Sequence, residues 1–370
     1  MKVTQINPEK LYSSEEITNY LNVSLRTTQR LLKSAELPSF KINGQYRIKG
    51  IDVLNYLNGV RLDNNNLIED ENIDKPSNLI NLLEISPIEI KMSANLAKII
   101  QENEQILLEQ TKLLREKIVL EMGFICPGIR FSDDTKLTEN KINILINGVK
   151  VFSDTTETLD GIFAKAENII KKYAYEIISR EEVFVIIQKL RKNYPVIVDD
   201  VLAEDFNDTN KLNIGEITKI IKKLLKEKVS IRNMRGILET ISDTIPYTKN
   251  IDEITNKVRE SLSRQICEYL ANDEIIEVIG LETELEKYFM DNISIEIDDS
   301  KSLNISSDKN KYFMEKLIEL NKEHKIKAII CNTKIRALLR NIIERNFPDI
   351  SVISYREIAK EYKVKLIATI

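Results

Sequence analysis

The sequence predicts an α+β chain of several domains, in which a small N-terminal domain precedes a larger body with mixed α/β and helical parts. The first observation is length, because 370 residues exceed what one ordinary hydrophobic core holds. The second is a pair of short helical patterns followed by a hairpin signal within the first sixty residues. The third is apolar spacing, which changes along the remaining chain from strands to a long helical stretch and back to alternating strands and helices.

Changes in composition and apolar spacing also place the expected domain boundaries. Residues 60–79 are polar and acidic with little periodicity, which is typical of a flexible tether. The parts that we expect are an N-terminal domain (1–59), an acidic flexible linker (60–79), an α/β subdomain (80–160), a helical subdomain (161–275) and a small α/β subdomain (276–370).

Charge is distributed unevenly along the chain. The net charge is −4, and 42% hydrophobic with 30% charged residues is a normal globular balance. Residues 1–60 nevertheless carry eight basic and five acidic side chains, so the rest of the chain is acidic. A basic end on an acidic body indicates that only the N-terminal end contacts nucleic acid.

The cysteines and the apolar segments indicate a cellular compartment. Cys126, Cys267 and Cys331 lie too far apart for a zinc or redox motif, so we expect buried, reduced thiols. The first ten residues lack the apolar core of a signal peptide, and no stretch approaches the ~20 apolar residues of a membrane helix. We therefore expect a cytoplasmic protein without direct membrane insertion.

Two short helices are predicted near the N-terminus. Ser13 is placed to cap the first helix, and Glu16, three residues later, completes a capping box. Ser24 is placed to cap a second helix over 25–33. Its leucines face inward, and its outward positions are Arg26, Thr27, Gln29 and Arg30. Two helices across a tight turn, with a polar outer face on the second, are typical of a helix-turn-helix.

A hairpin and a closing helix complete this module. Asn43-Gly44 separates two alternating segments, and this dipeptide is a strong hairpin signal because both residues tolerate positive φ. A last helix over 51–57 adds apolar residues to the small core. We interpret residues 1–59 as a winged helix-turn-helix in which the hairpin is the wing.

Seven residues of the module are candidate DNA contacts. Arg26 and Arg30 lie four apart on one helical face, where they can contact guanine edges or phosphates. Hydroxyls at the start of this helix can donate to phosphates, and the helix dipole favours anions there. Lys41 and Arg47 flank the wing. The candidates are Ser24, Arg26, Thr27, Thr28, Arg30, Lys41 and Arg47. The alternative, a solvated basic face on a protein-binding domain, stays open.

The order of these elements resembles the excisionase-type winged helices related to the MerR family. Their recurring pattern is S-x-E-E-(I/V)-(A/T)-x-x-L-x-V-S-x-R-T, then G-x-L-P and a G-x-x-R-(I/F) wing. The matching segments here are Ser13-Ser14-Glu15-Glu16-Ile17, Val23-Ser24-Leu25-Arg26-Thr27, Leu37-Pro38 and Gly44-Gln45-Tyr46-Arg47-Ile48. Glu36 stands where that family often has glycine. The resemblance implies binding of double-stranded DNA.

The body is regular in its apolar pattern. The expected elements are a strand over 80–90 interrupted by Pro87, a helix over 96–122 ended by Gly123, a hairpin of 141–146 and 149–152, helices from 161 to about 270, and then strand 327–331, helix 333–347, strand 350–353, helix 357–361 and strand 363–369. A lysine run opposes the apolar stripe of one central helix. It is either a solvated face or a second nucleic-acid patch.

No grouping in the body indicates catalysis. His324 is the single histidine and stands among charged residues at an expected helix end, not in a cleft. There is no P-loop or dinucleotide glycine motif. The acidic pairs Asp133-Asp134 and Asp199-Asp200 are interpreted as solvated rather than metal-binding. We therefore expect no enzyme, no catalytic residues, no cofactor and no metal.

Residues 80–370 resemble the cytoplasmic domain of the FHIPEP family, the FlhA-type subunit of the flagellar and type III secretion export gate. The matching segments, in order, are Glu121-Met122-Gly123-Phe124, Ile146-Asn147-Gly148-Val149, Val229 to Glu239, Arg264-Gln265-Ile266 and Ile353 to Ile358. The resemblance implies several subdomains that dock export chaperones and substrates in a ring. The family's transmembrane half is absent from this sequence, and 152–161 replaces a longer subdomain that contributes to the chaperone groove.

Two functions fit these features. In the first, the protein is a transcriptional regulator that binds double-stranded DNA, pairs its half-sites by forming a homo-oligomer, and senses or binds export components through its body. In the second, it is a soluble accessory protein of a flagellar or type III secretion apparatus whose helix-turn-helix docks protein. The first is our preferred expectation, and DNA binding by the basic face distinguishes the two.

Overall fold

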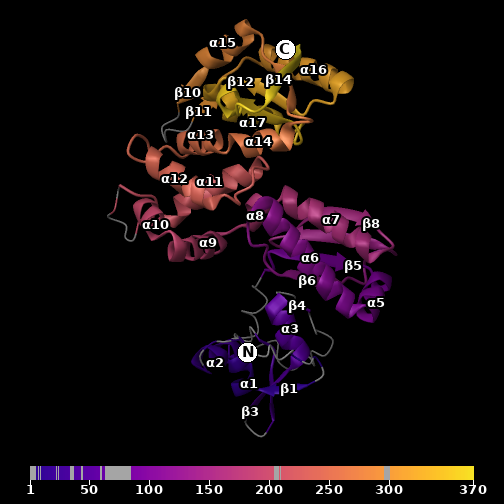
Figure 1. Ribbon diagram of the computed structural model, residues 1–370. Helices are drawn as coiled ribbons and strands as arrows, with labels where there is room; N and C mark the ends of the chain where they lie inside the picture. The colour runs from indigo at the N-terminus through magenta and orange to yellow at the C-terminus, as the bar shows by residue number, and fades with distance from the viewer. Residues whose placement is uncertain are drawn as a thin grey trace. The chain divides into compact units, whose positions relative to one another are not determined.

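The structure is a computed structural model, shown in Figure 1. It describes residues 6, 8, 10–21, 23, 25–33, 37–42, 45–58, 61–62, 85–203, 208, 210–295 and 301–370. The chain divides into two compact units: the first comprises Met1–Glu121 and Ile125–Ile178, and the second Met122–Phe124 and Ser179–Ile370. The mixture of helices with several separate sheets confirms the predicted α+β class.

The described residues of the N-terminal module form three helices and a small sheet. Its elements are β1 (Leu11–Ser13), α1 (Ser14–Leu21), α2 (Leu25–Lys33), β2 (Phe40–Ile42), β3 (Gln45–Lys49) and α3 (Gly50–Asn58). The strands are antiparallel in the order β1-β3-β2. One core joins β1, β3 and the three helices, through Tyr12, Ile17, Leu31, Leu32, Leu37, Ile48 and Val53.

Local signals in the sequence set most of these boundaries. The capping box at Ser13 is present: the Glu16 amide donates to Ser13 Oγ at 3.2 Å, and the Ser13 amide donates to Glu16 Oε2 at 2.8 Å. The second helix has the predicted bounds. Strand β1 was not predicted, because three residues give too short a pattern to recognise. Ser24 and the turn Asn43-Gly44 lie outside the described residues.

The rest of the first unit is a five-stranded mixed sheet with helices. The sheet has the order β4-β6-β5-β7-β8. Its strands are β4 (Arg61–Leu62), β5 (Ile88–Met92), β6 (Ile129–Asp133), β7 (Lys141–Ile146) and β8 (Val149–Thr155), and the helices are α5 (Ala94–Glu102), α6 (Glu104–Met122), α7 (Leu159–Lys172) and α8 (Ala174–Ile177). Alternate residues of β5 are buried, as expected for a sheet with one face covered by helices.

Several predictions for this unit need correction. The long helix breaks at Asn103, whose Nδ2 donates to the carbonyl of Ile99 at 2.7 Å, so α5 and α6 are separate helices. Strand β5 begins after Pro87 rather than at residue 80. Residues 61–62 of the predicted linker pair with β6, and residues 63–79 lie outside the described part.

The boundary between body parts also lies elsewhere than the sequence indicated. The first unit ends at Ile178, whereas the pattern placed a boundary at residue 160. Helix α7 carries buried apolar side chains, and the ring of its Phe163 lies 6.1 Å from that of Phe131 in β6. Packing on the sheet therefore places α7 with the preceding strands, although its periodicity is that of the helices that follow.

The second unit begins with a helical part. Its helices are α9 (Arg180–Asn193), α10 (Pro195–Val201), α11 (Ile214–Lys226), α12 (Met234–Thr244), α13 (Ile251–Ser261) and α14 (Ser263–Leu270). Capping boxes begin α9 and α11. Lys223 and Lys226 from the lysine run of α11 form ion pairs with Asp252 and Glu344, at 2.6 and 2.9 Å. These pairs favour the solvated face over a nucleic-acid patch.

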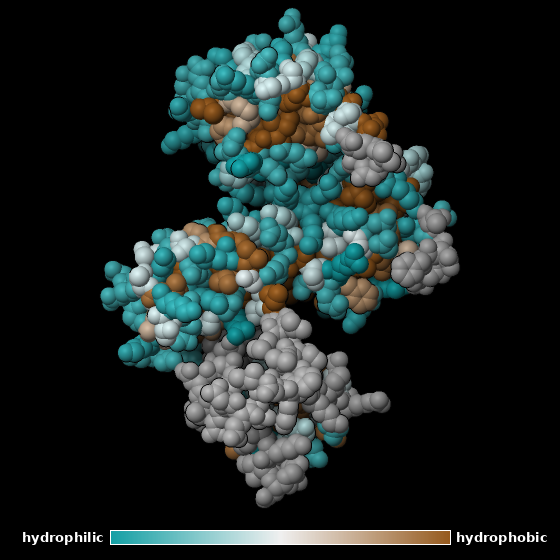
Figure 2. Space-filling model, turned by 180° about the vertical axis from the view of Figure 1, so that it is seen from behind, coloured by the Kyte–Doolittle hydropathy of each residue, from teal (hydrophilic) through white to brown (hydrophobic). Residues whose placement is uncertain are grey.

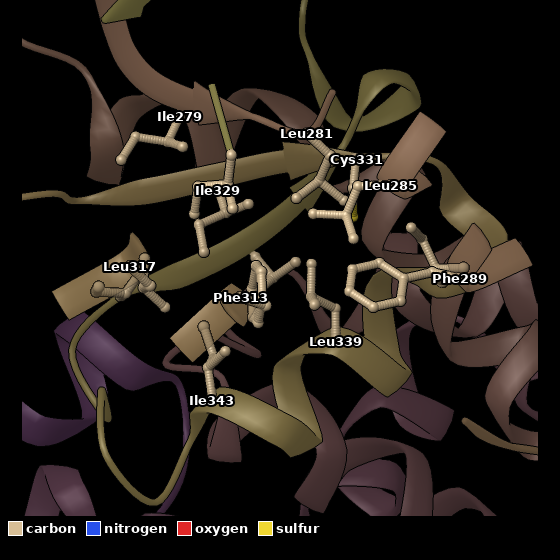
Figure 3. Close-up of a cluster of buried hydrophobic side chains, with 14 of the residues drawn as sticks. Ile279, Leu281, Leu285, Phe289, Phe313, Leu317, Ile329, Cys331, Leu339 and Ile343 are labelled. Atoms are coloured by element: carbon tan, nitrogen blue, oxygen red, sulfur yellow. The ribbon is translucent and has the colours of Figure 1, made fainter. Parts of the chain in front are cut away.

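The C-terminal part of this unit is a parallel sheet covered by helices. The elements are β9 (Ile275–Gly280), α15 (Thr283–Asp291), β10 (Ile293–Ile295), β11 (Lys301–Leu303), α16 (Ser307–His324), β12 (Ala328–Cys331), α17 (Thr333–Ile343), β13 (Ser351–Ser354), the 3-10 turn η2 (Tyr355–Glu357) and β14 (Lys363–Thr369). The sheet order is β13-β12-β9-β14. Figure 3 shows the core, where Phe289 and Phe313 meet edge to face at 5.6 Å. The helix expected over 357–361 is absent from these described residues, and the 3-10 turn η2 (Tyr355–Glu357) ends where this segment begins.

The described residues hold no candidate metal cluster and no helix long and apolar enough to cross a membrane. Cys126, Cys267 and Cys331 are buried free thiols. His324 ends α16 with its side chain exposed, and its Nε2 lies 3.5 Å from Glu323.

Candidate functional surfaces

Helix α2 is the element on which most predicted DNA contacts lie. Leu31, Leu32 and Thr28 form its buried face, and Thr28 is fully buried. The hydroxyl oxygens of Thr28 and Thr18 are hydrogen-bonded at 2.9 Å, which connects α2 to α1. Thr28 therefore belongs to the interior of the module, and its assignment as a DNA contact is wrong. Thr28 was named because hydroxyls at the start of this helix can donate to phosphates, but its side chain leaves the helix on the buried face.

The opposite face of α2 gathers basic positions. At 100° per residue, positions 26, 30 and 33 lie opposite the buried stripe of α2. Gln29 is exposed at the edge of this face. The side chains of Arg26, Arg30 and Lys33 lie outside the described part, so only their helix positions are fixed. Gln29 was expected to face outward but was not named as a DNA contact. Lys33 was not singled out, although its spacing from Arg26 and Arg30 predicts a shared face.

The remaining candidates lie at the helix start and on the wing. Thr27 is half-buried on α2. Arg47 on β3 is half-buried, and its Nη1 donates to the carbonyl of Tyr46 at 3.2 Å. Lys41 is placed opposite Tyr46 in the wing, and its side chain lies outside the described part. Arg26, Thr27 and Arg30 therefore lie on α2, and Lys41 and Arg47 lie on the wing, whereas Ser24 is outside the described residues. DNA contact by these residues stays a prediction.

A second candidate surface lies in the helical part of the second unit. Apolar side chains on α9 and α10 are exposed, namely Phe184, Val185 and Val196. Tyr194 lies between these helices with the guanidinium of Arg235 4.8 Å above its ring. Figure 2 shows that apolar surface interrupts the polar covering of the body. Because large exposed apolar patches mark protein-contact surfaces, we treat these side chains as candidates for such a surface.

Comparison with protein families covers nearly all of the chain. The model of the FHIPEP family matches residues 57–164 and 153–363, and that of the helix-turn-helix domain matches residues 11–61. The two FHIPEP segments meet at 153–164, where the sequence predicted a shortened subdomain. These matches confirm both predicted components. A specific relation to the MerR family stays a prediction.

Individual relatives are flagellar biosynthesis proteins and an invasion protein. The flagellar biosynthesis protein FlhA of Bacillus subtilis is 26% identical over 358 residues, covering 82% of this chain and 52% of that protein. FlhA of Borreliella burgdorferi is 26% identical over 421 residues, covering 96% and 59%, and the invasion protein InvA of Salmonella typhimurium is 24% identical over 57% and 30%. The chain spans about half the length of the curated FlhA relatives that it matches.

Solved structures share the fold of the body. The Shigella flexneri MxiA protein superposes with a TM-score of 0.66 at 21% identity, covering 78% of this chain and 99% of that one. The Chlamydia pneumoniae CdsV protein gives 0.70 at 20% identity, covering 78% and 97%, and the nonameric EscV cytosolic domain of a type III secretion system gives 0.65 at 19%, covering 77% and 96%. With a family model over most of its length and this fold, the chain belongs to the FHIPEP family.

Proposed function

We propose that this protein is a docking component of a flagellar or type III export apparatus, in which an FlhA-like body binds export proteins and a helix-turn-helix module precedes it. The observation that carries the proposal is the extent of the match. The family model covers both units of the body, and the fold covers nearly the whole length of the solved cytosolic domains. This supports the accessory function over the regulator that the sequence alone favoured.

The neighbours suggest which partners to test. One solved neighbour is a complex of CdsV with CdsO, and two others are nonameric. By analogy, we propose that the body binds a CdsO-type export protein and assembles with further copies of itself. The exposed apolar side chains on α9 and α10 are a surface that such contacts can use.

A second candidate function is DNA binding by the N-terminal module. It is favoured by the helix-turn-helix match and by the basic positions on the outer face of α2. The two functions are compatible, because the module and the export-type body are separate parts of the chain.

One pair of variants tests both candidates. Arg26→Ala/Arg30→Ala removes two cations from α2, and the matched control Lys219→Ala/Lys222→Ala removes two cations from α11. Calorimetric titration with the CdsO counterpart from the same genome is expected to show saturable binding by the parent chain. No binding by the parent would reject the docking proposal. Binding lost only in the α2 variant would place protein docking on the helix-turn-helix instead of the body.

Fluorescence anisotropy with duplex DNA at two salt concentrations tests the second candidate. DNA binding that weakens steeply with salt, is lost in the α2 variant and persists in the α11 variant supports it, since phosphate contacts release counterions. Equal, weak binding by all three chains rejects it.

A further inference from the structure

Four charged side chains meet in the interior of the second unit. Arg259 of α13 and Arg336 of α17 are each 2% exposed at the side chain, and Glu357 of η2 is 1% exposed. Glu227, which caps the C-terminus of α11, is 14% exposed. The helical part supplies Glu227 and Arg259, and the α/β part supplies Arg336 and Glu357. We call these four residues the charge cluster.

The contacts alternate in sign around the charge cluster. Arg259 holds Glu357 with two bonds, Nε to Oε1 at 2.7 Å and Nη2 to Oε2 at 3.1 Å. Arg336 Nη1 donates to Glu227 Oε2 at 2.6 Å. Arg259 Nη1 lies 3.3 Å from Glu227 Oε2, and Arg336 Nε lies 3.7 Å from Glu357 Oε1. Both short pairs therefore cross from the helical part to the α/β part.

Neighbouring groups fix the directions of these side chains. Asn256 Oδ1 accepts from Arg336 Nε at 3.3 Å and from Nη2 at 3.1 Å. This contact between α13 and α17 is a third bridge between the helical part and the α/β part. The Ser354 amide donates to Glu357 Oε2 at 3.1 Å. Each guanidinium thus has partners in the helical part and in the α/β part, which meet at this junction. The planar, forked shape of the guanidinium sets the directions of these contacts.

The physics of buried ion pairs decides what this arrangement does. The free energy needed to remove the charges from water is about as large as the free energy gained from their mutual attraction. Replacing such a cluster with apolar residues therefore often leaves the free energy of unfolding unchanged or raises it. Ion pairs in a low dielectric are, however, strict about distance and angle, whereas an apolar contact tolerates sliding. A cluster across a junction therefore contributes more to one defined orientation than to net stability.

We propose that the charge cluster is a latch that fixes one orientation of the helical part (179–270) relative to the α/β part (275–370), and that its loss lets the two parts adopt several orientations. The latch is independent of what the protein binds.

The test measures a distance across the junction in the full chain. Spin labels are attached to cysteines introduced as Lys219→Cys in α11 and Lys316→Cys in α16, since the native cysteines are buried. The main variant replaces the cluster with apolar residues, Arg259→Met/Arg336→Met/Glu227→Leu/Glu357→Leu. The expected result of pulsed electron spin resonance is a narrow distance distribution in the parent and a broad one in the variant, with helical circular dichroism retained.

Two further variants keep the test decisive. Glu227→Gln keeps the shape of one member and removes its charge, and it is expected to broaden the distribution even if the fourfold variant does not fold. Lys226→Ala is the matched control. Lys226 in α11 also pairs with Glu344, which caps the C-terminus of α17, but this exposed pair contributes little. The proposal is overturned if the fourfold variant folds and keeps the parent's narrow distance distribution. If the fourfold variant does not fold, the proposal is overturned when Glu227→Gln keeps that narrow distribution. It is also overturned if Lys226→Ala broadens the distribution equally.

Discussion

At the scale of single residues, Thr28 and Gln29 show how neighbouring positions on one helix have different roles. Thr28 is buried and hydrogen-bonded to Thr18, whereas Gln29 is exposed. Both are polar, so residue type alone does not separate them. The direction in which each side chain leaves the helix distinguishes the buried residue from the exposed one.

The hydrogen bond of Thr28 has a measurable effect on the N-terminal module. Thr28→Val keeps the shape of the side chain and removes one partner of a buried hydrogen bond, so we expect the free energy of unfolding of the module to fall by about 1 kcal/mol. Hydrogen exchange of the α1 and α2 amides measures this change in the full chain. Gln29→Ala is the control and should leave exchange unchanged. Unaltered protection in Thr28→Val would show that the Thr18–Thr28 bond contributes nothing.

Glu227 gives the second unit a pH dependence. Burial by itself raises the pKa of this carboxyl, but the positive charges of Arg259 and Arg336 outweigh burial and hold the pKa below its usual range. A carboxyl whose folded pKa is lowered contributes stability above its unfolded pKa, and this contribution disappears as the pH falls through the folded value. We therefore expect the free energy of unfolding to fall less steeply in Glu227→Gln than in the parent between neutral pH and about pH 3. Urea denaturation at several pH values checks this, with Glu344→Gln as an exposed control. Parallel curves for the parent and Glu227→Gln would contradict the argument.

At the scale of elements, Gly123 follows α6 and lies close to the backbone of residues 231–232 within the second unit. Its φ is +83°, and an added Cβ would lie 2.2 Å from the Arg232 nitrogen and 2.5 Å from its Cα. The Met122 carbonyl next to it accepts from the Ile231 amide at 2.8 Å. The sequence predicted only that Gly123 ends a helix; the approach of residues 231–232 is a tertiary feature.

Substitution of Gly123 should therefore cost more than ordinary helix-end strain. We expect Gly123→Ala to lower the free energy of unfolding by about 2–4 kcal/mol, because a rigid backbone occupies the space that the methyl group needs. Gly148→Ala is the matched control: its φ is +77°, but its nearest neighbour is the Ile85 side chain at 3.1 Å, which can move. Urea unfolding followed by circular dichroism compares the two. Equal losses would mean that backbone strain alone explains both.

At the scale of the whole molecule, the exposed apolar residues of α9 and α10 bear on assembly. Val196 is 69% exposed, and Phe184 on the preceding helix is also exposed. If the body assembles as its nonameric neighbours do, apolar side chains of this kind are buried in the process.

We accordingly expect the chain to form oligomers whose population rises with concentration, and Phe184→Ser/Val196→Asp to weaken them. Mass photometry over a dilution series measures the species present. Tyr247→Ser is the control, because Tyr247 is exposed on the turn after α12 and is not part of α9 or α10. A parent chain that stays monomeric at every concentration would reject self-assembly.

Much of the fold follows from local chemistry that the sequence displays. The capping box at Ser13 and Glu16 begins α1 as predicted, and Asn147-Gly148 forms the predicted turn with φ of +49° and +77°. Strands β6 and β9 were missed, because their short apolar runs resemble the ends of neighbouring segments. The break at Asn103 was missed because the apolar spacing continues through it.

By itself the sequence determined the two components of the chain, a helix-turn-helix and an FHIPEP-type body. Helix caps, turns and family motifs could be recognised because each consists of residues that are close together in the sequence. Only the tertiary structure decided that Thr28 lies inside, that α7 packs with the first sheet, and that Glu227, Arg259, Arg336 and Glu357 meet. The physical reason is distance along the chain. Up to 130 residues separate the members of the charge cluster, and their pairing depends on how helices and sheet pack, which no local pattern records.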